Sequence, residues 1–259
     1  MFEQSSINPI FPYKISATEE AEMSATETND TGVVFLSIGL GFMITSSIVF
    51  GLFFRHSPRE TQFKRSSLSL NLAVACFFSF LVYFSIVSDS GFTIRGKNNR
   101  AIYPLRYVDY FVYNSLLLWE VAWLGHTNND MQRYTVIGLE ALITWTQVIG
   151  AAVELKQVTW FMFIVTVMAS VYQIYYVGFN CRFNAPSGLR QSLAVQVSLM
   201  ALSRSMYLLA WGLTDASKVV PVDFTHLWYF ILDILMRCAL GMYFIVSAPP
   251  ISENLRKTN

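Results

Sequence analysis

Seven long apolar stretches constrain this chain more than any other feature of its sequence. Each has about 20 residues, enough to cross the ~30 Å hydrocarbon core of a bilayer as an α-helix. Apolar residues make up 54% of the chain and charged residues only 14%, which does not fit a soluble globular domain. We therefore expect an integral, multi-pass membrane protein: an all-α bundle of seven transmembrane helices. The predicted helices are Gly32 to Phe54, Ser67 to Val87, Ile102 to Leu124, Met131 to Val153, Gln157 to Phe179, Gln191 to Asp215 and Thr225 to Ala248.

The rest of the chain predicts two short polar tails around this membrane domain. Residues 1–31 are polar and acidic, residues 32–248 form the seven-helix domain, and residues 249–259 form a short tail. Pro249 and Pro250 are expected to end the last helix, because proline has no N–H to donate. We expect no appended soluble domain, which argues against a membrane-anchored cyclase, phosphodiesterase or kinase.

The distribution of Lys and Arg predicts the orientation. With the N-terminus outside, nine basic residues lie in the inner loops and tail and six lie in the outer segments. This bias favours an outer N-terminus and a cytoplasmic C-terminus. The sequon Asn29-Asp30-Thr31 is then outside, but it adjoins the first helix so closely that we expect no glycan there. The inner set is Arg55, Arg59, Lys64, Arg65, Arg133, Arg182, Arg190, Arg256 and Lys257; the outer set is Lys14, Arg95, Lys97, Arg100, Lys156 and Lys218.

The three cysteines do not predict a disulfide or a metal site. Cys76, Cys181 and Cys238 lie in or beside apolar segments, without paired spacing and without a nearby histidine. We expect them to behave as small buried apolar residues.

Seven charged residues fall inside the predicted spans, away from the span ends, and are the candidates for function. Each costs ~2.5 to 3.5 kcal/mol in hydrocarbon, so we expect them to face the bundle interior and to pair. They are Arg106, Asp109, Glu120, Glu140, Arg204, Asp233 and Arg237.

Helical spacing supports an interior position for these residues. Asp109 and Glu120 are eleven residues apart, about three turns, so they share one face at ~16 Å along the axis. Two acids so placed could serve a proton or cation path. Asp233 and Arg237 are four apart and also share a face.

Static packing is the competing interpretation of the buried charges, because ion pairs between membrane helices also hold bundles together. For Glu140 and Arg204 taken singly, we favour this structural role. For Arg106, Asp109, Asp233 and Arg237 as a set, we favour a present or ancestral functional site.

Two motifs resemble those of the microbial (type 1) rhodopsins, including the pump-like channelrhodopsins of cryptophyte algae. The third helix reads R-Y-V-D-Y from Arg106 to Tyr110, and the seventh reads D-I-L-M-R from Asp233 to Arg237. The resemblance covers all seven helices, although its specific motifs lie on the third, sixth and seventh.

The resemblance implies a role for each matching position. Arg106 matches the arginine on the outer side of the retinal pocket, Asp109 the counter-ion and proton acceptor, and Asp233 the second counter-ion. Glu120 falls where proton pumps hold an inner carboxylate donor. The implied pocket residues are the aromatics Tyr110, Tyr113, Phe161, Tyr207 and Trp211, with Met168 beside them.

Departures from the family pattern are more informative than the matches. The position of the Schiff-base lysine is Arg237, and the seventh helix contains no lysine. On the sixth helix, Arg204 replaces a tryptophan and Leu208 a proline. Guanidinium stays protonated and cannot condense with an aldehyde, so we expect no covalent retinal, and the Arg204 cation disfavours even non-covalent retinal. Arg237 is expected to stand in permanently for the protonated Schiff base and to engage carboxylates bidentately.

Three functions remain open at this point. The first is a retinal-free, opsin-related membrane protein with a structural, regulatory or partner-binding role. The second is an ion channel or transporter that works without light, its path lined by Asp109, Glu120, Glu140 and the three arginines. An enzyme is disfavoured, because the chain contains neither HExxH nor GxSxG. We expect no metal and no nucleic acid; the expected partners are the lipid bilayer, a dimer or trimer of this chain, or another membrane protein.

Overall fold

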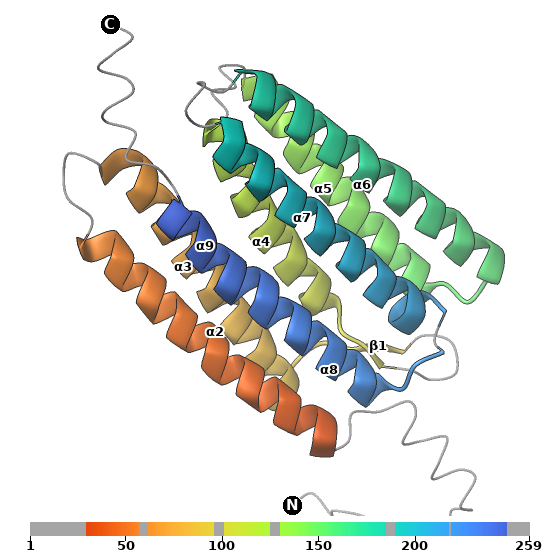
Figure 1. The fold of residues 1–259 in the computed structure, drawn as a ribbon. Helices are drawn as coiled ribbons and strands as arrows, with labels where there is room; N and C mark the ends of the chain where they lie inside the picture. Colours follow the sequence, from red (N-terminus) through yellow and green to blue (C-terminus); the bar gives the residue numbers. More distant parts are fainter. Residues whose placement is uncertain are drawn as a thin grey trace, which may run out of the picture.

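The structure, a computed structural model, describes residues 30–56, 62–95, 101–124, 130–184, 190–217 and 219–247. The described residues form a bundle of seven helical rods (Figure 1), which confirms the predicted fold class. The predicted tails lie outside the described residues except for Asp30 and Thr31, which belong to the first helix, so that helix begins two residues before its predicted start at Gly32. Asn29 of the sequon also lies outside the described residues. The helices are α2 (Asp30–His56), α3 (Gln62–Val87), α4 (Pro104–Leu124), α5 (Asp130–Ala152), α6 (Lys156–Asn184), α7 (Arg190–Trp211) with the π-helical η2 (Gly212–Ala216), and a last rod of α8 (Val222–Asp233), π-helical η3 (Ile234–Ala239) and α9 (Leu240–Ser247).

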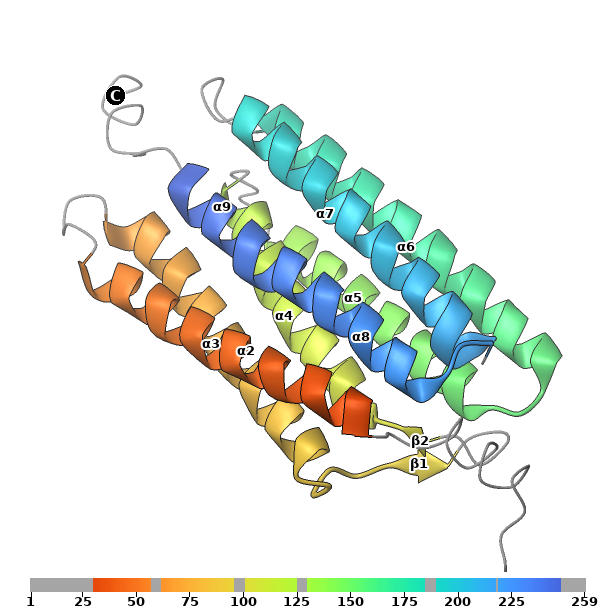
Figure 2. The ribbon, with the colours of Figure 1, turned by 60° about the horizontal axis from the view of Figure 1, so that its bottom comes forward.

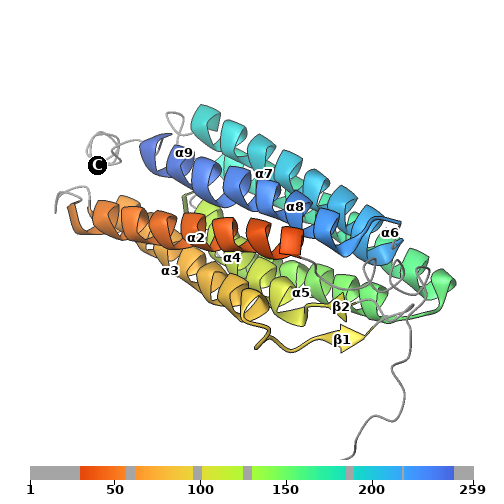
Figure 3. The same cartoon turned by 90° about the horizontal axis from the view of Figure 1, so that it is seen from below.

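The rods form a closed ring in chain order. Each of α2 to α7 packs against the next, and α8 contacts both α7 and α2, so the last rod closes the ring against the first. Figure 3 shows the last rod between α7 and α2. A closed ring has an interior, and the buried charges lie there.

Six helices are long and apolar enough to cross a membrane, by length and composition. The remaining rod, α4, carries three of the buried charges, Arg106, Asp109 and Glu120. Large apolar side chains on the outer surface, such as Phe84, Trp145 and Ile164, are exposed and suited to lipid contact. The chain is therefore an integral, multi-pass membrane protein.

A small hairpin replaces the predicted start of the third helix. β1 (Ile94–Arg95) pairs antiparallel with β2 (Ala101–Ile102), with Ile94 opposite Ile102. The helix begins two residues later than predicted, at Pro104, because the fixed φ of proline suits the first helical position and its missing N–H is not needed there. Figure 2 shows the hairpin beside the end of the bundle where α2 begins.

Two short π-helical segments interrupt otherwise regular rods. The segment η2 continues α7 and contains Asp215, and η3 interrupts the last rod and contains Arg237. Such wide turns occur mostly as single insertions in α-helices, frequently at functional sites. Both lie where a charged side chain enters the interior.

Candidate functional site: two buried arginine centres

Arg237 lies at the centre of the first group of buried charges. Its side chain is fully buried, and its Nη1 lies 2.7 Å from Oδ2 of Asp109 on α4. Its Nε donates to Oδ1 of Asp233, one turn earlier on the same rod, at 3.0 Å. The expected bidentate grip on one carboxylate is wrong: the guanidinium gives one N–H to each of two carboxylates. We call Arg237, Asp109 and Asp233 the Arg237 centre.

Hydroxyl groups from α3 and α7 complete the shell around the two aspartates. Ser79 donates to Asp109 at 2.7 Å and accepts from Arg237. Tyr83 donates to Asp233 at 2.6 Å, and Tyr207 donates to the other oxygen of the same carboxylate. The sequence had not singled out Ser79 or Tyr83, although their four-residue spacing on an apolar helix was an available signal.

Aromatic rings cover the remaining face of the guanidinium. The Arg237 Cζ lies 5.3 Å from the ring centre of Tyr110 and 4.9 Å from that of Tyr113, within the range of cation–π attraction. The Tyr113 hydroxyl donates to the Met236 carbonyl at 2.7 Å. Three of the expected pocket aromatics, Tyr110, Tyr113 and Tyr207, therefore surround this centre.

The other expected pocket residues lie elsewhere. Trp211 is buried, but it belongs to a cluster with Tyr107 and stacks on Phe163, with ring centres 5.9 Å apart. The placement of Phe161 and Met168 in the pocket is wrong, because they are 61% and 67% exposed on the outer surface of α6. Since successive residues of a helix are ~100° apart, a two-residue shift to Phe163 turns the side chain to the opposite face.

The second group of buried charges is built around Arg204. Both Nη atoms of Arg204 on α7 donate to the carboxylate of Glu140 on α5, one of them at 3.1 Å. Asn114 on α4 donates to Glu140 at 3.0 Å. Gln173 on α6 donates to Glu140 at 3.1 Å and accepts from Arg204 at 3.1 Å. These four residues, the Arg204 centre, join four helices.

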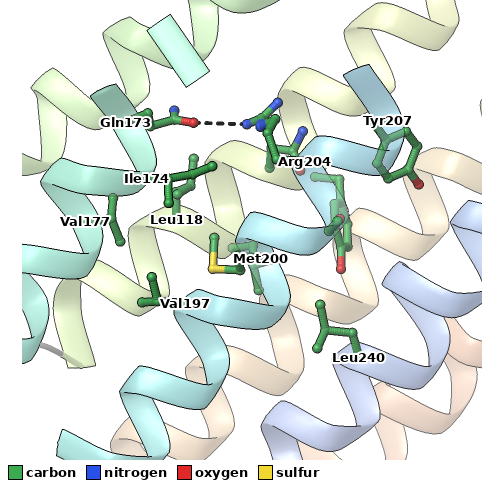
Figure 4. Close-up of a pocket in the computed structure, with 13 residues that line it drawn as sticks. Leu118, Gln173, Ile174, Val177, Val197, Met200, Arg204, Tyr207 and Leu240 are labelled. Atoms are coloured by element: carbon green, nitrogen blue, oxygen red, sulfur yellow. Dashed lines mark hydrogen bonds between the residues drawn. The ribbon is translucent and has the colours of Figure 1, made fainter. Parts of the chain in front are cut away.

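A small cavity lies beside the Arg204 centre. Figure 4 shows Arg204 and Gln173 at one end of it, with Met200, Val197 and Leu240 at the other. Its volume is about 40 Å³. That is room for about three water molecules.

Arg106 lies nearer the hairpin end than Arg237. Its Nη2 is 2.6 Å from Nδ1 of His226 on α8, and its Cζ lies 4.8 Å from the ring centre of Tyr229. Asp215 on η2 accepts from Tyr107 at 2.8 Å and lies 3.4 Å from the Tyr229 hydroxyl. Sequence reasoning missed the parts played by His226 and Asp215, because both lie at the ends of their predicted helices.

Glu120 is the last of the expected site residues. It is 2% exposed, and its carboxylate accepts a hydrogen bond from Asn71 on α3. Eleven residues of helix separate it from Asp109, so it lies ~16 Å along the axis from the Arg237 centre. The two acids thus occupy opposite halves of the bundle interior.

Known proteins share both the sequence pattern and the fold. The family model described as "Bacteriorhodopsin-like protein" matches residues 31–248. Among curated proteins, the chain is 29% identical to Protein FDD123 of Trametes versicolor over 175 residues, 64% of this chain and 60% of that one. It is 27% identical to Archaerhodopsin-2 of Halobacterium sp. over 158 residues, 59% of this chain and 60% of that one. These matches thus span about 60% of the relatives' own length.

Solved structures agree with the family match at the level of the fold. The light-driven proton pump LR (Mac) from Leptosphaeria maculans has a TM-score of 0.77 at 20% identity, covering 86% of this chain and 98% of that one. The light-driven proton pump CsR from Coccomyxa subellipsoidea has a TM-score of 0.78 at 18% identity, with 86% and 99% covered. The chain belongs to the bacteriorhodopsin-like protein family, the microbial rhodopsins.

Proposed function

We propose that this protein is a retinal-free microbial rhodopsin relative that does not use light, with a structural, regulatory or partner-binding role in its membrane. The observation that carries the proposal is the Arg237 centre. A permanent cation from the protein, paired at 2.7 Å with Asp109 and at 3.0 Å with Asp233, occupies the position at which the family resemblance implies a Schiff-base lysine.

Amine chemistry supports the proposal. A lysine can form a Schiff base because burial can lower its proton affinity until the free amine appears, whereas guanidinium stays protonated. The last rod, Val222 to Ser247, contains no lysine that could substitute. A cation that neither deprotonates nor isomerises cannot drive a light-dependent proton cycle.

The second centre also supports the absence of retinal. Arg204 crosses from α7 to Glu140 on α5 at the position where the family pattern has a tryptophan. The cavity between Tyr113, Arg204 and Tyr207 has about 40 Å³, against ~300 to 1,000 Å³ for typical ligand pockets. A polyene placed there would meet a buried charge without enough space.

We propose no catalytic role for the buried charged residues. Their carboxylates are held by arginines, amides and hydroxyls, an arrangement that suits a stable interior and an interaction partner in the membrane. The proposed partners are a second copy of this chain, in dimers or trimers, or another membrane protein.

Ion conduction is the second candidate function, of the kind found in the cryptophyte channelrhodopsins that the motifs resemble. The observation that favours it is the row of buried acids, Asp109, Glu140 and Glu120, with a water-sized cavity beside Arg204. Voltage clamp of membranes containing the full chain separates the two candidates. A closed, ion-paired bundle passes no current above that of protein-free membranes, whereas a channel gives currents that Glu120→Gln or Glu140→Gln alters.

The first test of the proposal is an absorption spectrum of the purified protein with and without all-trans retinal. We expect wild type to show no visible band. Arg237→Lys restores an amine at this position, and Arg237→Met serves as the matched control that has neither an amine nor a charge. Arg237→Lys combined with Arg204→Trp also removes the second cation.

Each spectral outcome has a distinct meaning. Colour in the lysine variants but not in Arg237→Met identifies Arg237 as the residue that excludes retinal. Colourless variants that remain folded mean that the pocket itself is closed. A retinal-dependent visible band in wild type would refute the proposal.

A further inference from the structure

A groove on the membrane-facing side of the bundle lies between α6 and α7, near the hairpin end. Its volume is about 650 Å³. Figure 1 shows α6 and α7 side by side, with the α5–α6 connection at the same end as η2. The lining is mainly apolar and includes Trp160, Phe163, Leu208, Leu209 and Leu213. The volume falls within the ~300 to 1,000 Å³ of typical ligand pockets.

Small residues keep the groove open. Gly212 and Ala216 line it one turn apart on η2. Glycine has no side chain and alanine has only a methyl group, so neither residue fills the groove. A Cβ at Gly212 would already come within 3.1 Å of the Phe163 ring. Phe163 lines the groove without filling it, because its half-buried ring is stacked on that of the buried Trp211.

The depth of the groove matches one leaflet of a bilayer. Phe163 lies seven residues into α6 from Lys156, and Leu208 lies nine residues before Ser217. At 1.5 Å per residue these distances are about 10 and 14 Å, close to half of the ~30 Å hydrocarbon core. Trp160, which is 54% exposed, lies near the mouth, as tryptophans do at membrane–water interfaces. At this depth, the acyl chains of lipids are the groups that can cover an apolar surface.

The mouth of the groove carries both signs of charge. Glu154 and Lys156 are exposed, two residues apart, and both line the groove with the hydroxyl-bearing Thr159 and Ser217. A headgroup with a phosphate and an ammonium complements this pair, with its phosphate toward Lys156 and its ammonium toward Glu154. Among the described residues of the mouth, a purely anionic headgroup or a fatty acid would meet one cation, Lys156, and one repelling carboxylate, Glu154.

We infer that this groove binds one phospholipid with a zwitterionic headgroup, its acyl chain between α6 and α7 and its headgroup at Glu154 and Lys156. The inference does not depend on the proposed loss of retinal, because none of the groove residues belongs to either arginine centre. It adds a specific lipid to the general contact between the bundle and its bilayer.

Competitive lipid retention tests this site. The full chain is incorporated into vesicles of equimolar phosphatidylcholine and phosphatidylglycerol, extracted in mild detergent and weighed by native mass spectrometry. We expect one retained phosphatidylcholine per chain, favoured over phosphatidylglycerol about fivefold, as about 1 kcal/mol of headgroup attraction gives. Equal retention of the two lipids, or a dimer mass without lipid, would overturn the inference.

Two variants separate the groove from the rest of the lipid-facing surface. Leu209→Trp fills the groove from its edge, where Leu209 is 49% exposed, and should abolish the retained lipid. Leu202→Trp is the matched control, because Leu202 is 57% exposed two turns away on the same helix and does not line the groove. Equal loss of lipid in both variants contradicts the site.

Charge at the mouth provides an independent check. Glu154→Lys makes both rim residues cationic without touching the apolar groove, so the preference should reverse toward phosphatidylglycerol by about fivefold. An unchanged preference for phosphatidylcholine would show that Glu154 and Lys156 do not select the headgroup. The inference that the site prefers a zwitterionic lipid would then be wrong.

Discussion

Arg237 and Arg204 are both buried in the same bundle, but they are held by different kinds of partner. Arg237 lies between two carboxylates, Asp109 and Asp233, under hydroxyl groups and aromatic rings. Arg204 faces one carboxylate, Glu140, which is supported by side-chain amides and lies beside a water-sized cavity. In the Arg237 centre one cation thus pairs with two carboxylates, whereas in the Arg204 centre one cation pairs with one carboxylate.

The two centres therefore depend on their arginines to different degrees. Loss of Arg237 leaves two buried anions, Asp109 and Asp233, without their cation, and neither of them lines the cavity beside Arg204. Loss of Arg204 leaves one buried anion, Glu140, which still accepts from Asn114 and Gln173. Loss of Glu140 leaves the Arg204 cation, whose side chain is 12% exposed and lines the cavity. The Arg237 centre should therefore be the more sensitive to single substitutions and the more tolerant of complete neutralisation.

The largest effect is expected for Arg237→Met. Breaking a buried ion pair from one side leaves uncompensated charge and costs about 3 to 5 kcal/mol of unfolding free energy. Thermal or denaturant unfolding in detergent measures it. Adding Asp109→Asn and Asp233→Asn should recover most of the loss, because neutral amides need no cation. A triple variant that unfolds as easily as Arg237→Met alone would contradict this account and indicate that the guanidinium matters for packing.

A smaller loss is expected for Glu140→Gln in the second centre. The Arg204 cation loses its counter-charge, but it still donates to Gln173 and lines a cavity large enough to admit water, so we expect a loss of about 2 kcal/mol. Arg204→Leu and the double variant complete a cycle that isolates the coupling between the two residues. A loss for Glu140→Gln equal to that of Arg237→Met would remove the distinction between the centres.

The smallest effect is expected for single hydroxyl groups in the Arg237 centre. Tyr83→Phe removes a hydrogen bond to the Asp233 carboxylate and should cost about 1.5 kcal/mol. Tyr110→Phe is the matched control, since the buried Tyr110 hydroxyl has no hydrogen-bond partner among the described residues. We expect less than about 0.5 kcal/mol for the control. If both phenylalanine variants lose equal stability in the same unfolding assay, the hydrogen bond to Asp233 does not explain the cost.

Sequence reasoning was most successful where the signal lies within one helix. The apolar stretches predicted the bundle, and the four-residue spacing placed Asp233 and Arg237 on one face, where they pair at 3.0 Å. The charges of α4 likewise defined its inner face. On α6, the polar residues Thr166, Ser170 and Gln173 recur at helical spacing and are all buried, so they mark the inner face. The sequence thus contained a signal for this face, but the family resemblance pointed to Phe161, which lies on the opposite side.

The sequence could not predict which residues pair between different helices. Nothing in the spacing connects Arg204 to Glu140, 64 residues away, or Arg106 to His226, 120 residues away. The family resemblance suggested that Asp109 and Arg237 meet, but it gave no hint of Ser79 or Tyr83 around them.

Hydrophobicity and helical spacing are local properties, so they were sufficient to predict the seven spans, the membrane class and the set of charges that must avoid lipid. The tertiary structure was needed to show which charges pair across helices and where a groove remains open on the outer surface. These depend on the rotation and axial register of every helix against its neighbours, which the packing of all seven side-chain surfaces sets together.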